Sequence, residues 1–262
     1  VFAGDVDALV LRYTATGREV IAEDGDGVTL RVAAGEHWHA LVCWCLEQGF
    51  HGFENLALIP GTVGAAPIQN IGAYGVELAP FVEAVHAVRI ADGETLTFSR
   101  TDCAFGYRDS IFKGELRDAV VITAVDFRLQ RGSAPITGYP SLREALAGQA
   151  TAPGPRDVFK AVVALRRARL PDPATAPNAG SFFKNPVVDR ATADRLAGCY
   201  PGMPQFEAVG GRKLAAGWLI EQCGWRGVER EGVAVHPGHA LVLVNRSGDG
   251  RALLALAQHI QA

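Results

Sequence analysis

The fold is decided by the uncharged stretch Leu58-Ile59-Pro60-Gly61-Thr62-Val63-Gly64-Ala65-Ala66-Pro67-Ile68-Gln69-Asn70-Ile71-Gly72-Ala73-Tyr74-Gly75. Its density of glycine and proline argues against a helix, and its lack of charge argues against a solvated linker. We predict a main chain that turns tightly, stays largely buried and lets backbone N–H groups approach a ligand. Such an uncharged cradle suits a large, partly apolar cofactor that also carries phosphates.

Composition limits the possible classes of protein. The 262 residues form one large domain or two, and the net charge of −3 argues against a nucleic-acid partner. No apolar run approaches the roughly 20 residues of a membrane span. The five cysteines are odd in number and lack the spacing of a disulfide framework, which is typical of reduced thiols in a cytoplasm.

Periodicity predicts a strand-rich first half and a mixed second half. We expect a hairpin over 20–32, a helix over 36–48, a hairpin over 82–98, a strand over 120–129 and a helix over 156–169. Pro171-Asp172-Pro173 ends that helix, so a domain boundary is placed there, between 1–170 and 171–262. Beyond it we expect helices over 191–198, 214–223 and 253–260, and strands over 233–235 and 240–244.

One cluster of His and Cys residues resembles a metal site but is interpreted as structural. His37, His39, Cys43 and Cys45 have no second ligand pair downstream, so core packing of a Trp- and Cys-rich helix is preferred. The sequence also lacks the G-x-G-x-x-G fingerprint and the phosphate-binding P-loop. We therefore predict no metal site and neither of those two nucleotide-binding folds.

Three further segments carry unusual chemistry. Arg108 lies among aromatic residues, where it stabilises an anion or simply pairs with Asp109. Ser181 lies between a glycine turn and two phenylalanines, and it is either a proton donor or a cap. Lys213 opens an expected helix and either faces an anion or is solvated.

Taken together, five strings resemble one family. They are 55–61 (NLALIPG), 67–75 (PIQNIGAYG), 106–110 (GYRDS), 179–186 (AGSFFKNP) and 215–220 (AAGWLI). In this order they resemble UDP-N-acetylenolpyruvoylglucosamine reductase, the bacterial flavoenzyme that makes UDP-N-acetylmuramate for peptidoglycan. The stretch from Tyr139 to Arg169 is similar to the longer subclass, whose loop carries a substrate-binding tyrosine.

The resemblance implies an α+β fold and an oxidoreductase. Residues 1–170 would form an FAD-binding region of the vanillyl-alcohol-oxidase type, and residues 171–262 a substrate-binding domain. NADPH would reduce non-covalently bound FAD, and flavin N5 would pass hydride to the enolpyruvyl group of the sugar nucleotide. Arg108 would stabilise the developing anion and Ser181 would donate the proton. We expect a cytoplasmic monomer with no membrane or nucleic-acid partner.

The resemblance also implies two sets of binding residues. The FAD set is Ile59, Pro60, Gly61, Thr62, Val63, Gly64, Ala65, Gln69, Asn70, Gly72, Ala73 and Tyr74. The substrate set is Tyr139, Arg169, Lys184, Asn185 and Lys213, while Arg166 is a weaker candidate. The family's Gly-Ser-Asn flavin loop and its catalytic glutamate are expected outside residues 1–262.

Two other classes of function stay open at this point. One is a flavin oxidase of the same architecture that attaches its cofactor through His or Cys. The other is a sugar-nucleotide binder that has lost its chemistry.

Overall fold

The computed structural model describes residues 7–148 and 151–262, which form two compact units. The N-terminal unit is Val10–Arg166, and the C-terminal unit is Arg167–Ala262 together with residues 7–9. The units therefore divide within a helix, four residues before the boundary that the prolines predict. Whether cofactor and substrate binding divide at the same place stays a prediction.

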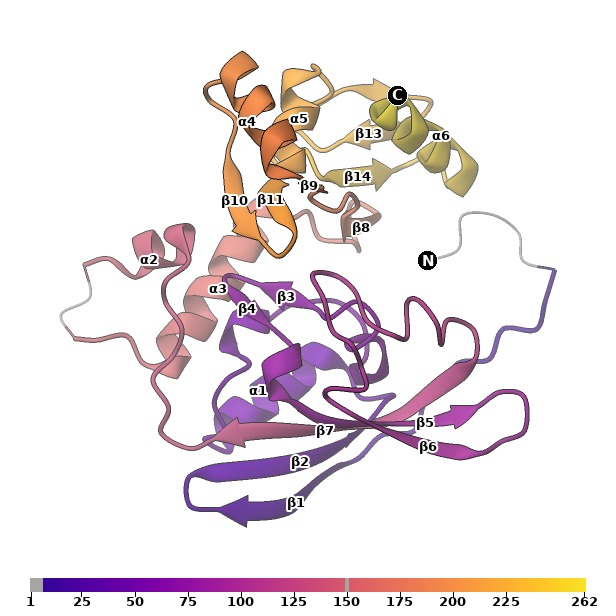
Figure 1. Cartoon of the computed structure of the whole chain (residues 1–262), viewed down its shortest axis with the longest axis vertical. Coiled ribbons are helices and arrows are strands. Elements are labelled where there is room, and N and C mark those ends of the chain that lie inside the picture. The colour runs from indigo at the N-terminus through magenta and orange to yellow at the C-terminus, as the bar shows by residue number, and fades with distance from the viewer. Residues whose placement is uncertain (1–6, 149–150) are drawn as a thin grey trace. The chain divides into compact units, whose positions relative to one another are not determined.

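The N-terminal unit is built on a five-stranded antiparallel sheet in the order β1-β2-β7-β5-β6 (Figure 1). Its elements are β1 (Arg18–Asp24), β2 (Gly27–Ala33), α1 (Trp38–Glu47), β3 (Gly72–Ala73), β4 (Val76–Glu77), β5 (Val82–Arg89), β6 (Thr95–Ser99), β7 (Val120–Gln130), α2 (Pro140–Leu146) and α3 (Pro155–Arg169), with short 3-10 turns at Glu54–Leu56, Val63–Ala65 and Ala79–Phe81. Both predicted hairpins and the long strand are confirmed; the helix α2 was missed.

Alternation along β2 explains how the sheet buries one face. Val28, Leu30 and Val32 are fully buried, whereas Arg31 on the opposite face forms a bidentate pair with Asp126 of β7. Helix α1 packs on the buried face with Trp38, Leu41, Val42, Cys45 and Leu46, the same side that the sequence predicted. The core of this unit therefore lies between the sheet and α1.

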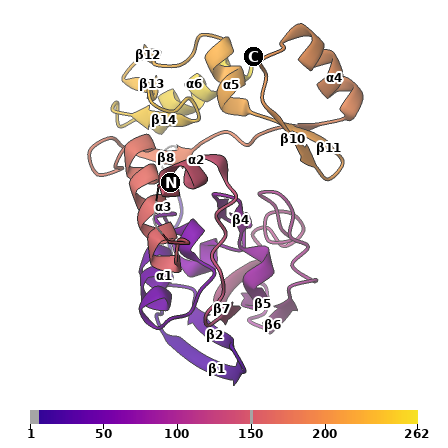
Figure 2. The same ribbon diagram turned by 90° about the vertical axis from the view of Figure 1, so that its left-hand side faces the viewer.

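Helix α3 lies beside α1 within the N-terminal unit (Figure 2). The ring of Phe159 stacks on His39 of α1 with 5.8 Å between centroids and 5° between planes. Val158 and Val162 are fully buried in the same core. This packing fixes the part of α3 up to Arg166.

The C-terminal unit holds two smaller sheets, ordered β10-β11-β9 and β12-β13-β14-β8. Its elements are β8 (Asn178–Ser181), β9 (Val187–Val188), α4 (Arg190–Cys199), β10 (Gln205–Ala208), β11 (Gly211–Leu214), α5 (Ala216–Gln222), β12 (Glu229–Arg230), β13 (Val233–Val235), β14 (Val242–Asn245) and α6 (Gly250–Gln261). Its apolar centre includes Ile220, Val235, Leu243 and Leu256.

The expected helix over 214–223 is wrong at its start. Leu214 belongs to β11, and α5 begins only at Ala216. The cause is the Gly210-Gly211 pair, because both residues have positive φ and a Cβ on Gly211 would lie 2.0 Å from the carbonyl oxygen of Val188. The chain therefore turns into a strand where apolar spacing alone indicates a helix.

No helix in residues 7–148 and 151–262 is both long enough and apolar enough to cross a bilayer.

Candidate functional site

The glycine-rich stretch Ile59–Tyr74, called the cradle below, is anchored at its start by a histidine. Leu58 has a left-handed φ of 56°, and its N–H donates to Nδ1 of His39 at 3.1 Å. Further along, Gly64 N donates to Ala34 O at 2.9 Å. A Cβ on Gly64 would lie 2.6 Å from the Cβ of Ala34, so this glycine permits close backbone packing.

The cradle is less buried than the sequence predicted. Of the twelve residues proposed to line the cofactor, Val63 and Asn70 are buried, Pro60, Gly61, Ala65 and Gln69 are exposed, and Ile59, Thr62, Gly64, Gly72, Ala73 and Tyr74 lie between. Val63 packs in the apolar core and Asn70 is buried among polar partners, while the exposed members keep uncharged residues at the surface. An open surface of small, uncharged residues is what a ligand needs to approach the main chain.

Arg108 lies against the cradle. Its guanidinium donates from Nη2 to the carbonyl of Gly72 and, at 3.4 Å, from Nη1 to the carbonyl of Asn70. Its ion-pair partner is Glu77 at 3.8 Å, so the predicted alternative of a pair with Asp109 is wrong. The side chain remains 29% exposed, which leaves it accessible to a bound anion.

Two other candidates of the N-terminal unit meet at Tyr74. The ring of Tyr139 packs edge-on to that of Tyr74 with 5.4 Å between centroids. Arg166 of α3 lies near Tyr74, and burial lowers the pKa of its guanidinium although Tyr74 opposes that shift. Within the described residues, the buried Nε of Arg166 has no hydrogen-bond partner. A half-buried cation of this kind is a suitable partner for an anionic ligand.

The remaining candidates belong to the C-terminal unit. Ser181 is exposed at the end of β8, where it pairs with Val242 of β14. Asn185 caps α5, since its Oδ1 accepts from Ala216 N at 2.9 Å. Lys213 lies on β11 opposite Phe206, with its Nζ 6.0 Å from that ring, and not in the first turn of a helix as predicted.

Lys184 and Arg169 are both exposed. Burial is the main cause that lowers the pKa of His239, and the positive charge of Arg169 adds to it. Ser181 ends β8 in the four-stranded sheet, whereas Lys213 is on β11 in the three-stranded sheet. Lys184 and Asn185 lie in the loop between β8 and β9.

The histidine and cysteine residues of α1 have structural roles. His39 accepts from Leu58 N, stacks on Phe159 and lies 3.8 Å from Sγ of Cys43. Among residues 7–148 and 151–262 there is no group of three or more His, Cys, Asp or Glu side chains placed to hold a metal ion.

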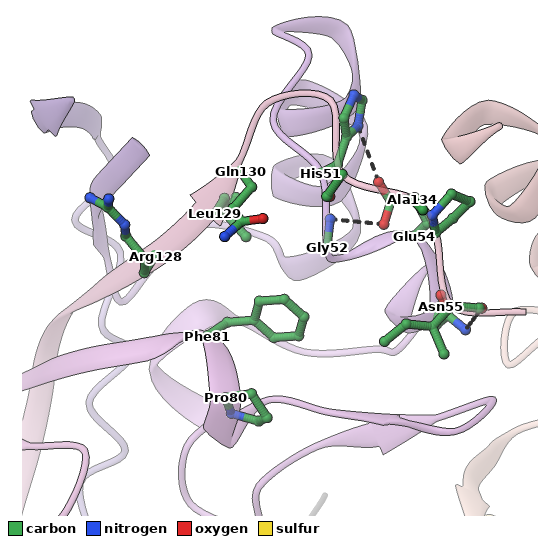
Figure 3. Close-up of a pocket in the computed structure, with 13 residues that line it drawn as sticks. His51, Gly52, Glu54, Asn55, Pro80, Phe81, Arg128, Leu129, Gln130 and Ala134 are labelled. Carbon is green, nitrogen blue, oxygen red and sulfur yellow. Dashed lines mark hydrogen bonds and ion pairs between the residues drawn. The ribbon is translucent and has the colours of Figure 1, made fainter. Parts of the chain in front are cut away.

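A cavity of about 290 Å³ also lies in the N-terminal unit (Figure 3). In Figure 3, Phe81 and Pro80 face His51 and Glu54 across it, and Nδ1 of His51 lies 3.3 Å from Oε1 of Glu54. Asn55 in its wall donates to the carbonyls of Tyr74 and Ile136, both at 2.9 Å. None of the predicted site residues lines this cavity, so it is separate from the cradle.

The residues of the N-terminal unit fit a dinucleotide flavin. The cradle presents small uncharged residues, and a Cβ on Gly72 would lie 2.8 Å from Arg108 Nη1 and 2.9 Å from the carbonyl of Val76. Arg108 and Arg166 supply positive charge beside it, and Arg166 keeps a buried donor without a partner. The uncharged cradle suits the flat ring of a flavin, and the two arginines suit its anionic phosphates.

Sequence reasoning missed Glu77 and gave Arg166 little weight. Glu77 lies in the β3–β4 hairpin just after the cradle and contacts both Arg108 and Asn70. No motif marks either residue, because a single charged residue on a strand or helix is usually solvated.

Comparisons with known proteins agree on one family. The sequence model described as UDP-N-acetylenolpyruvoylglucosamine reductase, C-terminal domain, matches residues 172–262, and the one described as FAD binding domain matches residues 2–99. Relatives named UDP-N-acetylenolpyruvoylglucosamine reductase occur in Burkholderia ambifaria and Burkholderia multivorans, each 52% identical over 266 residues, and in Paraburkholderia phymatum, 51% identical over 267 residues. These alignments cover 100% of the chain and 76%, 76% and 77% of the respective relatives.

A solved structure also resembles the chain. The crystal structure of UDP-N-acetylenolpyruvylglucosamine reductase from Thermus caldophilus gives a TM-score of 0.61 at 24% identity, covering 88% of this chain and 67% of that one. At this identity the likeness concerns the fold, which is α+β as expected.

Proposed function

Since the chain belongs to the UDP-N-acetylenolpyruvoylglucosamine reductase family, we propose that it reduces the enolpyruvyl sugar nucleotide with NADPH and that Ser181 donates the proton. The family makes the protein an FAD-dependent oxidoreductase of peptidoglycan synthesis. The observation that best supports the proposal is the attachment of the Arg108 guanidinium to the carbonyl of Gly72 in the cradle.

The cradle would hold the flavin through its main chain. When bound there, FAD would supply the hydride chemistry that links NADPH to the terminal alkene carbon of the enolpyruvyl group. The exposed backbone at Pro60, Gly61 and Ala65 lets the protein lie close to a flat ring. Arg166 would donate its unused Nε–H to an anionic or carbonyl group of the cofactor.

Arg108 and Ser181 would serve the second half of the reaction. Hydride addition leaves enolate-like charge next to the substrate carboxylate, and a fixed guanidinium stabilises charge that develops there. Ser181 would place its hydroxyl proton on the adjacent carbon, which completes the reduction. Its exposed position at the end of β8 leaves the hydroxyl available to a substrate.

The other candidates would bind the sugar nucleotide. Lys184, Lys213 and Arg169 bring positive charge, which suits a diphosphate and a carboxylate. Tyr139, whose ring packs against Tyr74, would donate a hydrogen bond to the substrate from its hydroxyl. Asn185 would lie beside the substrate, with its Oδ1 accepting from Ala216 N at the start of α5.

The two half-reactions test these roles separately. We expect Ser181→Ala in the full-length, flavin-loaded enzyme to leave flavin reduction by NADPH nearly unchanged and to slow reoxidation by the enolpyruvyl substrate by about 100-fold or more. Stopped-flow absorbance follows both steps. Equal slowing of the two steps would mean that Ser181 supports the structure and does not donate the proton.

A further inference from the structure

Asn70 uses its whole side chain inside the protein. The residue is 1% exposed, and Nδ2 donates both to Oε2 of Glu77 at 3.0 Å and to the carbonyl of Gly106 at 2.9 Å. Its Oδ1 accepts from Ala79 N at 2.9 Å. Both amide protons and the carbonyl oxygen therefore have protein partners, which leaves the side chain without a free donor for a cofactor.

The second of these bonds holds the turn that carries Arg108. Gly106 and Asp109 exchange two backbone hydrogen bonds, so Tyr107 and Arg108 form the tip of a tight hairpin. Arg108 has a φ of 53° there, a left-handed conformation that a residue with a Cβ adopts at a cost of about 1 kcal/mol or more. The carbonyl of Gly106 is the point at which Asn70 fixes this strained turn to the cradle.

The first bond holds the carboxylate that faces the guanidinium. Oε2 of Glu77 accepts from Asn70, while Oε1 lies 3.8 Å from Nη1 of Arg108. The backbone carbonyl of Asn70 accepts from the same guanidinium. Asn70 thus restrains Arg108 in three ways. Its backbone carbonyl binds the guanidinium directly, and its side chain holds both the turn at Gly106 and the Glu77 carboxylate.

We propose that Asn70 and Glu77 form a clamp that positions Arg108 for the substrate half-reaction. This proposal rests on the role of Arg108 given above. Asn70 is a positioning residue that sets where the guanidinium lies, and its side chain does not contact FAD. Glu77 is the second half of the clamp, since its carboxylate is oriented by Asn70 and limits the positions open to Arg108. Loss of the Asn70 amide frees the turn and the Glu77 carboxylate together, whereas loss of the Glu77 carboxylate frees the guanidinium alone.

The clamp can be tested in the full-length enzyme by exchanging the amide and the carboxylate between positions 70 and 77. Asn70→Asp keeps the acceptor for Ala79 N but places a carboxylate against Glu77 and removes the donor to Gly106. We expect this variant to slow flavin reoxidation by the enolpyruvyl substrate by about tenfold or more, because small misplacements of a catalytic group cost rate. Reduction by NADPH and the dissociation constant of FAD, measured by flavin fluorescence, should change by less than about threefold.

The swapped pair should restore part of the loss. In Asn70→Asp/Glu77→Gln the amide and the carboxylate exchange places, so one hydrogen bond and the net charge are recovered, while the carbonyl of Gly106 keeps its bond from Asp109 N but not the one from residue 70. We expect substrate reoxidation to recover by about threefold or more relative to Asn70→Asp alone. A residue that merely supports folding would not show this selective rescue of one half-reaction.

Asn55→Asp is the matched control. Asn55 is equally buried and its amide also donates to two backbone carbonyls, one of them in the cradle at Tyr74, but it does not contact the Arg108 turn. We expect a lower melting temperature in calorimetry with the ratio of the two half-reaction rates unchanged. If Asn55→Asp shifts that ratio as Asn70→Asp does, general loosening of the cradle explains the effect and the clamp is refuted.

The remaining outcomes are also decisive. Weaker FAD binding in Asn70→Asp, with both half-reactions slowed equally, would make Asn70 a cofactor contact and overturn the proposal. The variant Arg108→Ala distinguishes a failure of the clamp proposal from a failure of the proposed role of Arg108. If Arg108→Ala slows reoxidation but the Asn70 variants do not, the clamp is wrong; if Arg108→Ala has no effect, the role of Arg108 itself is wrong.

Discussion

Four of the seven described non-glycine residues with left-handed backbone lie in or beside the candidate site. Leu58, Asn70, Tyr74 and Arg108 have φ values of 56°, 43°, 49° and 53°. Each costs on the order of 1 kcal/mol and persists only where neighbouring contacts determine the conformation. Those contacts are visible here, since His39 binds Leu58 N, Asn55 binds the carbonyl of Tyr74, and Asn70 fixes the turn of Arg108.

Gly72→Ala tests how closely Arg108 lies on the cradle. A Cβ at this position would lie 2.8 Å from Nη1 of Arg108 and 2.9 Å from the carbonyl of Val76, and that backbone cannot move freely within the β3–β4 hairpin. We expect a loss of about 1–3 kcal/mol in the free energy of unfolding and slower substrate reoxidation. Gly114→Ala is the control, because its Cβ would lie 3.8 Å from its nearest neighbour. Equal behaviour of both variants in denaturant titrations and stopped-flow would contradict the close contact.

His239 makes the stability of the C-terminal unit depend on pH. Burial, followed by the nearby Arg169, lowers its pKa below the ordinary value of 6.5, so the unfolded chain binds the proton more readily than the folded protein. The stabilisation is therefore complete above pH 6.5 and is lost as the pH falls through the pKa of the folded state. We expect His239→Gln to flatten the fall in unfolding free energy between about pH 7 and 5 in urea titrations. An unchanged slope would show that other groups cause the dependence.

At the scale of elements, periodicity predicted the parts that bury one clear face. The hairpins of the first sheet and α1 follow from alternating or helical spacing, as in Val28, Leu30 and Val32. The short strands β8 and β9 were not predicted, because each is too short to show an alternating pattern and is held by pairing with a strand further along the chain, β14 and β11 respectively. The Gly210-Gly211 turn overrode the helical pattern that begins at Leu214.

The start of α5 depends on one amide oxygen. Oδ1 of Asn185 accepts from Ala216 N, and the residue at the N-cap, Ala215, has no side chain able to do so. We expect Asn185→Ala to lower the free energy of unfolding by about 1 kcal/mol. Asn185→Asp retains the oxygen and should keep the stability within about 0.5 kcal/mol, with the charge favourable at a helix N-terminus. Equal destabilisation of the two variants would mean that the cap contributes little.

The candidate site could be predicted only in part. Its motifs indicated Arg108, Ser181 and the cradle, because these residue types in sequence carry the family resemblance. The contact between Tyr74 and Tyr139, the clamp at Asn70 and Glu77, and the buried Nε of Arg166 depend on tertiary packing. No local pattern encodes such contacts between segments that lie far apart in the chain.

At the scale of the whole molecule, the described residues form two units with separate cores. The N-terminal unit holds the cradle, Arg108, Tyr139 and Arg166, and the C-terminal unit holds Ser181 and the remaining substrate candidates. Each unit folds around its own apolar cluster. Arg108 and Ser181, which we propose to serve the same half-reaction, therefore come from different units.

Thiol chemistry reports on both units at once. Cys199 and Cys223 are exposed, whereas burial raises the pKa of Cys103 to about 12 and that of Cys45 further. We expect Ellman's reagent to label Cys199 and Cys223 rapidly in the native protein, and Cys45 and Cys103 only on unfolding. Mass spectrometry of the labelled peptides assigns the sites. Rapid native labelling of Cys45 or Cys103 would contradict the packing of the N-terminal unit.

We propose that this protein carries electrons from NADPH to an enolpyruvyl sugar nucleotide and that the cradle holds the flavin. Anaerobic absorption spectroscopy of the full-length enzyme tests both halves of this reaction. We expect NADPH to bleach the visible absorption band of the bound flavin, and UDP-N-acetylglucosamine enolpyruvate then to restore that band with formation of UDP-N-acetylmuramate. Bleaching by NADPH without recovery on adding that substrate would rule out the proposed reaction.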